Sequence, residues 1–233
     1  DNNRTTLILI HGFWGLGSVF AGLVPMLDDA LNVLIVHDPF FGRPQGPQTV
    51  YDWAVFYLTA LKEHVPSDHC VILGGYSSGA LIALKMASMW CAWHAASLKS
   101  IILLDPGIYE VTDISKLDPT AIDDELQHGL QLFGHDQRAY VQQHFTKLGP
   151  LMLSLREQPK YCGRGLYVST NDTLKSGVSQ WWANNYPLLQ VHHASTTHHT
   201  LFEGNGLGEL SKAINQQCVP NLHPLGRNFP AVA

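Results

Sequence analysis

Residues 73–80 read Leu-Gly-Gly-Tyr-Ser-Ser-Gly-Ala, a Gly-x-Ser-x-Gly motif centred on Ser77. The apolar residues 70–73 precede the motif, and residues 80–87 follow it with the composition of a helix. A strand, a sharp turn and a helix in this order form the context of a nucleophile elbow, in which the two glycines leave room for a strained turn. The same spacing also occurs in flexible Gly/Ser loops, so it is the flanking segments that favour a serine nucleophile, exposed at the turn.

The composition points to a single globular domain, residues 1–233. Hydrophobic residues make up 45% of the chain and charged residues 14%, which supports a sizeable core and argues against disorder. The formal net charge is −5 and the 14 Lys and Arg residues are scattered, so we expect no nucleic-acid partner. No stretch is long and apolar enough to span a bilayer, and the polar start is unlike a signal peptide. The four widely spaced cysteines fit reduced thiols, so we expect a cytoplasmic protein without membrane contact.

Short apolar segments alternate with helical ones along most of the chain. This alternation predicts an α/β fold with a mostly parallel central sheet flanked by helices. The expected strands are residues 5–10, 31–36, 70–73, 100–104, 165–169 and 188–191, and the expected helices are 18–27, 51–64, 80–87 and 208–217.

One block breaks the alternation and predicts an insertion at about residues 110–160. It reads as helices over residues 121–132, 137–148 and 151–156, joined by Gly and Pro. Such a block between the strands of the sheet is most simply a lid over the active-site edge.

The loop after the first strand, residues 11–17, reads His-Gly-Phe-Trp-Gly-Leu-Gly. In a serine hydrolase this loop lies beside the nucleophile and donates a backbone N–H to the oxyanion. We therefore expect the oxyanion hole to consist of the N–H groups of Phe13 and of Ser78, the residue after the nucleophile.

Two aspartates compete for the role of the acid. Asp105 directly follows residues 100–104, and the carboxyl ends of parallel strands are where active sites collect, although an Asp before Pro106 also suits a plain turn. Asp172 follows the later strand, residues 165–169.

Histidines are clustered late in the chain, at His192, His193, His198 and His199. Adjacent histidines point to different sides of an extended chain, and no acidic residue lies at ligand spacing. We therefore expect no bound metal.

With these features in place, the chain resembles the type I thioesterase domains that end nonribosomal peptide and polyketide synthases, within the α/β-hydrolase superfamily. Residues 74–80 are similar to that family's elbow, residues 100–105 to the strand that carries its acid, and residues 198–202 to its histidine loop. The resemblance implies Asp105 as the acid and His198 as the base. Asp172 stays the alternative acid and His199 the alternative base.

The resemblance also implies a function. The chain would release an acyl group, polyketide or peptidyl, from the phosphopantetheine arm of a carrier protein through an acyl-Ser77 intermediate, by hydrolysis or cyclisation. It implies no directly bound cofactor, and a carrier protein in the same polypeptide. The absence of an initiator methionine agrees with a domain of a longer chain. The alternatives are a stand-alone serine esterase or editing-type thioesterase with Asp172 as acid, or an inactive binding module.

Overall fold

The central element of the fold is a six-stranded sheet. The computed structural model describes residues 5–41, 43, 46–94, 96–107, 119–146 and 160–219. Its strands run in the order β2-β1-β3-β4-β5-β6, and every neighbouring pair is parallel. The strands are β1 (Thr5–Ile10), β2 (Leu31–Val36), β3 (Cys70–Tyr76), β4 (Ser97–Leu104), β5 (Gly165–Ser169) and β6 (Leu189–His193). The predicted parallel sheet is confirmed.

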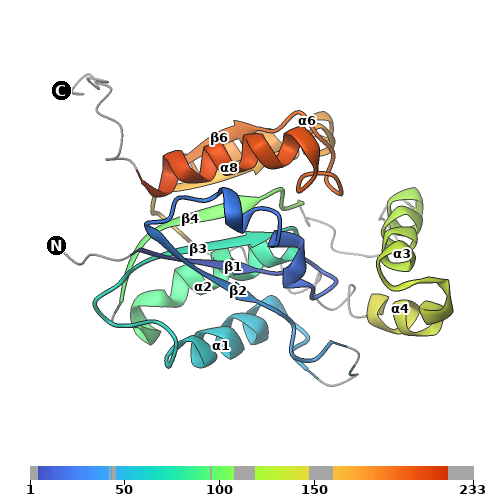
Figure 1. The fold of residues 1–233 in the computed structure, drawn as a ribbon, viewed down its shortest axis with the longest axis horizontal. Coiled ribbons are helices and arrows are strands. Elements are labelled where there is room, and N and C mark those ends of the chain that lie inside the picture. The colour runs from blue at the N-terminus through green and yellow to red at the C-terminus, as the bar shows by residue number, and fades with distance from the viewer. Residues whose placement is uncertain are drawn as a thin grey trace.

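Helices cover both faces of this sheet (Figure 1). The helices are α1 (Val50–Leu61), α2 (Ser78–Trp93), α3 (Pro119–Phe133), α4 (Arg138–Phe145), α6 (Asn171–Lys175), α7 (Val178–Asn185) and α8 (Gly204–Cys218). Figure 1 shows α1 and α2 on one face, α8 on the other, and α3 and α4 beyond one end of the strands. Among the described helices, none combines the length and the hydrophobicity that crossing a membrane requires.

The core lies on the two faces of the sheet because successive side chains of a strand point to opposite sides. Ile8 and Ile10 of β1 pack in the cluster that includes α1 and α2, whereas Leu7 and Leu9 pack in the cluster that includes α8. All four side chains are fully buried. This burial on both faces explains why the strand reads as a continuous apolar run rather than an alternating one.

One expected helix is wrong, and two helices were missed. Residues 18–27 do not form one α-helix but two short 3₁₀ segments, Gly17–Phe20 and Val24–Met26. Pro25 lies in the second segment, and its missing N–H and fixed ring prevent an α-helix from running through this position. Helices α6 and α7 were not expected from the sequence at all.

Only part of the expected lid is described. Helices α3 and α4 begin within two residues of their predicted starts, at Pro119 rather than residue 121 and at Arg138 rather than residue 137. Helix α4 ends at Phe145 rather than at residue 148. The third expected helix, residues 151–156, lies outside the described residues.

The topology of the sheet locates the site. From β1 the chain moves outward to β2, then returns to pair β3 with the opposite side of β1. Ligands of open α/β sheets bind at such a switch point, beyond the carboxyl ends of the strands. The loop after β1 and the turn after β3, which carry Phe13 and Ser77, therefore meet at this edge.

The two glycines of the elbow let its backbone pack tightly. A Cβ on Gly75 would collide with the carbonyl of Gly79, and a Cβ on Gly79 would collide with the carbonyls of Ile10 and His11. Real Cβ atoms do not approach backbone this closely, so the first turn of α2 lies directly on the end of β1. The spacing of the motif is thus a packing requirement as well as a chemical one.

We predict that Gly79→Ala lowers the free energy of unfolding by about 3 kcal/mol or more, because the new methyl group meets backbone that cannot yield. Gly208→Ala is the matched control: it also lies in a helix, and its Cβ would have nothing within 4 Å. That variant should gain about 0.5–1 kcal/mol from helix propensity. Urea unfolding of both variants measures the difference, and equal effects would contradict the packing argument.

Candidate active site

Ser77 lies at the turn between β3 and α2 in a backbone conformation that is rare for a residue with a side chain. Its φ is 54° and its ψ is −122°. It is the residue before the first turn of α2, yet its side chain makes no capping hydrogen bond to the helix. The hydroxyl is therefore held away from its own helix. The expectation that Ser77 is exposed is wrong, since only 8% of the residue is accessible. The walls of a pocket, described below, enclose it.

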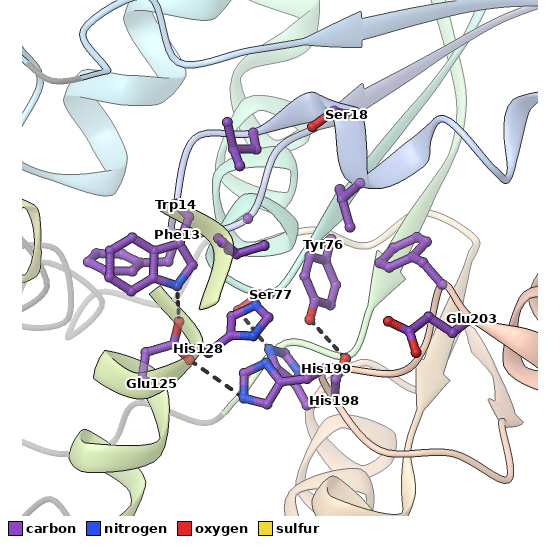
Figure 2. Close-up of a pocket in the computed structure, with 15 residues that line it drawn as sticks. Phe13, Trp14, Ser18, Tyr76, Ser77, Glu125, His128, His198, His199 and Glu203 are labelled. Atoms are coloured by element: carbon purple, nitrogen blue, oxygen red, sulfur yellow. Dashed lines mark hydrogen bonds and ion pairs between the residues drawn. The ribbon is translucent and has the colours of Figure 1, made fainter. Parts of the chain in front are cut away.

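The hydroxyl of Ser77 faces the predicted base. Ser77 Oγ lies 3.2 Å from His198 Nε2, and His198 Nδ1 lies 2.7 Å from Asp105 Oδ2. Because an ionised carboxylate can only accept, Nδ1 carries a proton and a neutral His198 presents the lone pair of Nε2 to the hydroxyl. The structure thus brings together Ser77, Asp105 and His198 in one hydrogen-bonded chain (Figure 2 shows Ser77 and His198).

The carboxylate of Asp105 is completely buried. Its Oδ1 accepts hydrogen bonds from the Thr170 N–H (3.0 Å) and the Thr173 hydroxyl (2.7 Å), and its Oδ2 accepts one from the Thr170 hydroxyl (2.9 Å). A buried charge is tolerated only when it is paired and hydrogen-bonded. The turn after β5 and the start of α6 therefore hold this carboxylate in the orientation that meets His198.

The charge of Asp105 sets the protonation of the histidine. Burial lowers the pKa of His198, but the hydrogen bond and charge of Asp105, with the charges of Glu125 and Asp172, outweigh burial and raise the pKa above its ordinary value of 6.5. A raised pKa makes the ring a stronger proton acceptor.

Asp172, the alternative acid, contacts the backbone of His198 rather than its ring. Its Oδ2 accepts a hydrogen bond from the His198 N–H at 2.8 Å. On the other side, the Tyr76 hydroxyl donates to the His198 carbonyl at 2.8 Å, and the two rings stack with centroids 4.8 Å apart. The two residues together fix the loop that carries the base.

The alternative base also points elsewhere. His199 Nε2 lies 3.9 Å from Glu125 Oε2 on α3, and the His199 ring lies 4.1 Å from that of His128 (Figure 2). His193 Nδ1 of β6 lies 3.3 Å from Ser169 Oγ. Within the described part of the chain, no group of three or more His, Cys, Asp or Glu side chains is arranged to hold a metal ion.

The loop predicted to supply an oxyanion donor is braced from the core. His11 is 3% exposed, and its Nδ1 donates to the Gly12 carbonyl at 2.6 Å while its Nε2 accepts from the Tyr57 hydroxyl. Burial lowers the pKa of His11 to about 4, so the ring is neutral at pH 7. The Gly12 carbonyl also accepts from the Gly15 N–H at 3.0 Å. The N–H of the same peptide unit belongs to Phe13 and points the opposite way.

The second predicted donor, the Ser78 N–H, begins helix α2. The first N–H groups of a helix have no partner within the helix, and the helix dipole places partial positive charge there. An anion next to Ser77 therefore meets a favourable field.

A pocket of about 300 Å³ opens in front of Ser77. The residues that line it come from the loop after β1, the nucleophile elbow, helix α3 and the histidine loop; they include Phe13, Trp14, Ser77, Glu125, His128, Leu132, His198 and His199 (Figure 2). The Trp14 indole N–H donates to Glu125 of α3. Burial lowers the pKa of His128, with a further contribution from His199, and favours its neutral form.

Several residues of the site were missed by the sequence reasoning. Thr170 and Thr173 lie at the start of α6, where the Thr170 N–H also donates to the Thr173 hydroxyl at 2.9 Å, and no sequence pattern indicates their contact with Asp105. The contribution of Glu125 and His128 depends on how α3 packs, for which the sequence carries no signal.

The fold and this arrangement are those of an α/β-hydrolase, and comparison with known proteins agrees. The sequence model of the Alpha/beta hydrolase family matches residues 7–202, so the chain belongs to this family. The chain is 35% identical over 218 residues to the nonribosomal peptide synthetase agiA of Aspergillus flavus; the match covers 94% of the chain and spans 3% of the synthetase. It is 25% identical over 237 residues to the thioesterase frbE of Dothideomycetidae sp., covering 91% of the chain and 88% of frbE.

Solved thioesterase structures share the fold. The NocB thioesterase domain, in covalent complex with a fluorophosphonate nocardicin G analogue, has a TM-score of 0.72 at 22% identity, with 91% of this chain and 94% of that one covered. RedJ, a thioesterase of Streptomyces coelicolor, has a TM-score of 0.69 at 18% identity, with 93% and 92% covered. The expected resemblance to thioesterase domains is confirmed.

The two aspartates can be separated by experiment. Asp105→Asn replaces the acceptor for His198 Nδ1 and favours the wrong tautomer, so kcat should fall by about 10⁴-fold. Asp172→Asn keeps an oxygen that can accept from the His198 N–H, so kcat should fall by less than about tenfold. Steady-state kinetics on a thioester substrate measures both variants. The reverse order of losses would make Asp172 the acid.

Proposed function

We propose that the chain is a serine thioesterase. It releases a polyketide or peptidyl acyl group from the phosphopantetheine arm of a carrier protein through an acyl-Ser77 intermediate. The observation that carries the proposal is the chain of hydrogen bonds from Ser77 through His198 to Asp105, with Ser77 lining the pocket. The likeness to agiA and frbE supports the choice of a thioester substrate within this hydrolase family.

In the proposed acylation step, the three hydrogen-bonded residues act together. As Ser77 Oγ bonds to the thioester carbonyl carbon, His198 Nε2 takes the hydroxyl proton, and Asp105 stabilises the imidazolium. The Phe13 and Ser78 N–H groups bind the oxyanion, each contributing on the order of 3 kcal/mol in the transition state. When the C–S bond breaks, His198 returns the proton to the departing thiolate, which leaves an ester on Ser77.

Deacylation uses the same groups with a new nucleophile. His198 takes a proton from water, which gives hydrolysis, or from a hydroxyl or amine of the acyl chain, which gives cyclisation. The ester C–O bond to Ser77 then breaks, and His198 returns the proton to Ser77 Oγ. Helices α3 and α4 act as a lid in this proposal, because α3 contributes Glu125, His128 and Leu132 to the pocket wall. No cofactor enters any of these steps.

The carrier protein is the expected partner. A thioester on a phosphopantetheine arm reaches a serine only if the arm enters the pocket, so the pocket mouth must lie next to the bound carrier. The 3% share that the match occupies in agiA supports a place for this chain within a longer synthase. We propose that the carrier belongs to the same polypeptide.

The test of the function compares acyl N-acetylcysteamine thioesters with oxygen esters of the same acyl groups. We expect the wild-type protein to turn over the thioester faster, and Ser77→Ala to lose at least about 10⁴-fold in kcat with an unchanged melting temperature. A preference for oxygen esters would favour the stand-alone esterase, and activity retained by Ser77→Ala would refute the serine mechanism.

The pH dependence follows from the pKa of His198. The active form is the neutral ring, so kcat/KM should rise with pH and level off above the pKa. Because Asp105 and its neighbours raise that pKa, the midpoint of the acid limb should lie above 6.5. A pH profile of kcat/KM measures it, and a midpoint below 6.5 would contradict the assigned pairing of His198 with Asp105.

A further inference from the structure

We propose that His144 of α4 is a positioning residue that holds the Phe13 peptide in place, so that the oxyanion hole depends on the docking of α3 and α4. The inference rests on the proposed function, because it takes the Phe13 N–H as an oxyanion donor. His144 itself touches no reacting atom in this account and acts through the loop.

The contact is a hydrogen bond from the lid to the loop. His144 Nε2 lies 3.0 Å from the carbonyl oxygen of Phe13. A carbonyl can only accept, so His144 Nε2 carries the proton and donates. His144 is 4% exposed, which shields this bond from competing water.

This bond completes the fixing of the loop around Phe13. The peptide before Phe13 is held by its Gly12 carbonyl, which accepts from His11 Nδ1 and from the Gly15 N–H. The peptide after Phe13 is held through the Phe13 carbonyl, which accepts a hydrogen bond from His144. Two peptide planes joined at one Cα leave two soft dihedrals, and fixing both planes fixes both dihedrals. The Phe13 N–H lies in the plane that the core holds, and α4 holds the adjoining plane, so a shift of α4 acts on the N–H through the two dihedrals at Phe13.

Aromatic packing ties His144 to the same loop. The His144 ring stacks on the Trp14 ring, with centroids 5.3 Å apart and an interplanar angle of 26°, and lies 5.0 Å from the Phe13 ring. Trp14 also packs against the buried side chains of Leu130 and Val141. Both lid helices therefore rest on the two residues that follow Gly12.

Gly129 of α3 has no side chain, and this lets the helix lie directly against Trp14 of the loop. A Cβ on Gly129 would collide with the indole of Trp14. The indole N–H in turn donates to Glu125, one turn earlier on α3 (Figure 2). The lid thus cannot move off the loop without breaking the contacts that hold Phe13, which gives a physical route from lid position to oxyanion stabilisation.

Two substitutions of His144 distinguish the effect of its hydrogen bond from the effect of its ring packing. His144→Phe keeps an aromatic ring on Trp14 but loses the donor, and His144→Gln keeps an N–H donor but loses the ring. If the hydrogen bond positions the oxyanion donor, His144→Phe should lower kcat by about tenfold or more with little change in KM. His144→Gln should stay within about threefold of the wild type. A role in packing alone predicts the opposite order.

Three measurements accompany the kinetics. Labelling of Ser77 to its end point by a fluorophosphonate counts the competent molecules, and melting temperatures report on folding. The midpoint of the acid limb in kcat/KM should not move, because neither variant touches His198 or Asp105. Gln143→Ala, an exposed neighbour on the same helix, is the matched control and should behave as the wild type. If His144→Phe does not fold, His144→Met, an adaptable apolar side chain, replaces it with the same expectation.

The outcomes distinguish this inference from the proposed function. A wild-type protein that neither turns over thioesters nor labels at Ser77 would refute the proposed function itself. Given wild-type turnover, equal kcat for His144→Phe and wild type would overturn the positioning role. An equal loss in His144→Phe and His144→Gln would overturn it too, because the loss would not follow the hydrogen bond.

Discussion

The buried carboxylate of Asp105 is the constraint on which the site depends. A fully buried charge must be satisfied on every side, and here the donors come from two segments: the start of α6, with the Thr170 N–H, the Thr170 hydroxyl and the Thr173 hydroxyl, and the histidine loop, with the His198 ring. The end of β4, the start of α6 and the histidine loop are thereby held in one arrangement. Loss of any one donor leaves part of the charge unpaired. The same hydrogen bonds therefore stabilise this region and orient the His198 ring.

The backbone is strained at Ser77 and Asp105, which follow the neighbouring strands β3 and β4. Ser77 and Asp105 are the non-glycine residues with positive φ within the described part of the chain, at 54° and 47°. Strain of this kind persists only where the surroundings impose it. Here the sheet does so, because the Ser77 N–H donates to the Leu104 carbonyl and the Asp105 N–H to the Val168 carbonyl. The hydrogen-bonding pattern of the strands thus continues one residue into the site and fixes where each side chain starts.

Much of this could be predicted from the sequence, for local reasons. The apolar strands and the glycines around Ser77 are short-range signals, and Asp105 stands out because it directly ends a strand. The role of His198 came from the resemblance to a family rather than from spacing. What could not be predicted are contacts between distant segments. Thr173 meets Asp105 across 68 residues, and His144 meets Phe13 across 131. The prediction of one α-helix over residues 18–27 was wrong because these residues, with Pro25 among them, form two short 3₁₀ segments instead.

The central claim is that the acyl group passes through Ser77, and mass spectrometry tests it most directly. The wild-type protein is mixed with a hexanoyl N-acetylcysteamine thioester, quenched in acid at successive times, and its intact mass and peptides are measured. We expect a gain of one hexanoyl group on the peptide that contains Ser77, and no gain in Ser77→Ala. An acyl group on another residue, or acylation that persists in Ser77→Ala, would contradict it.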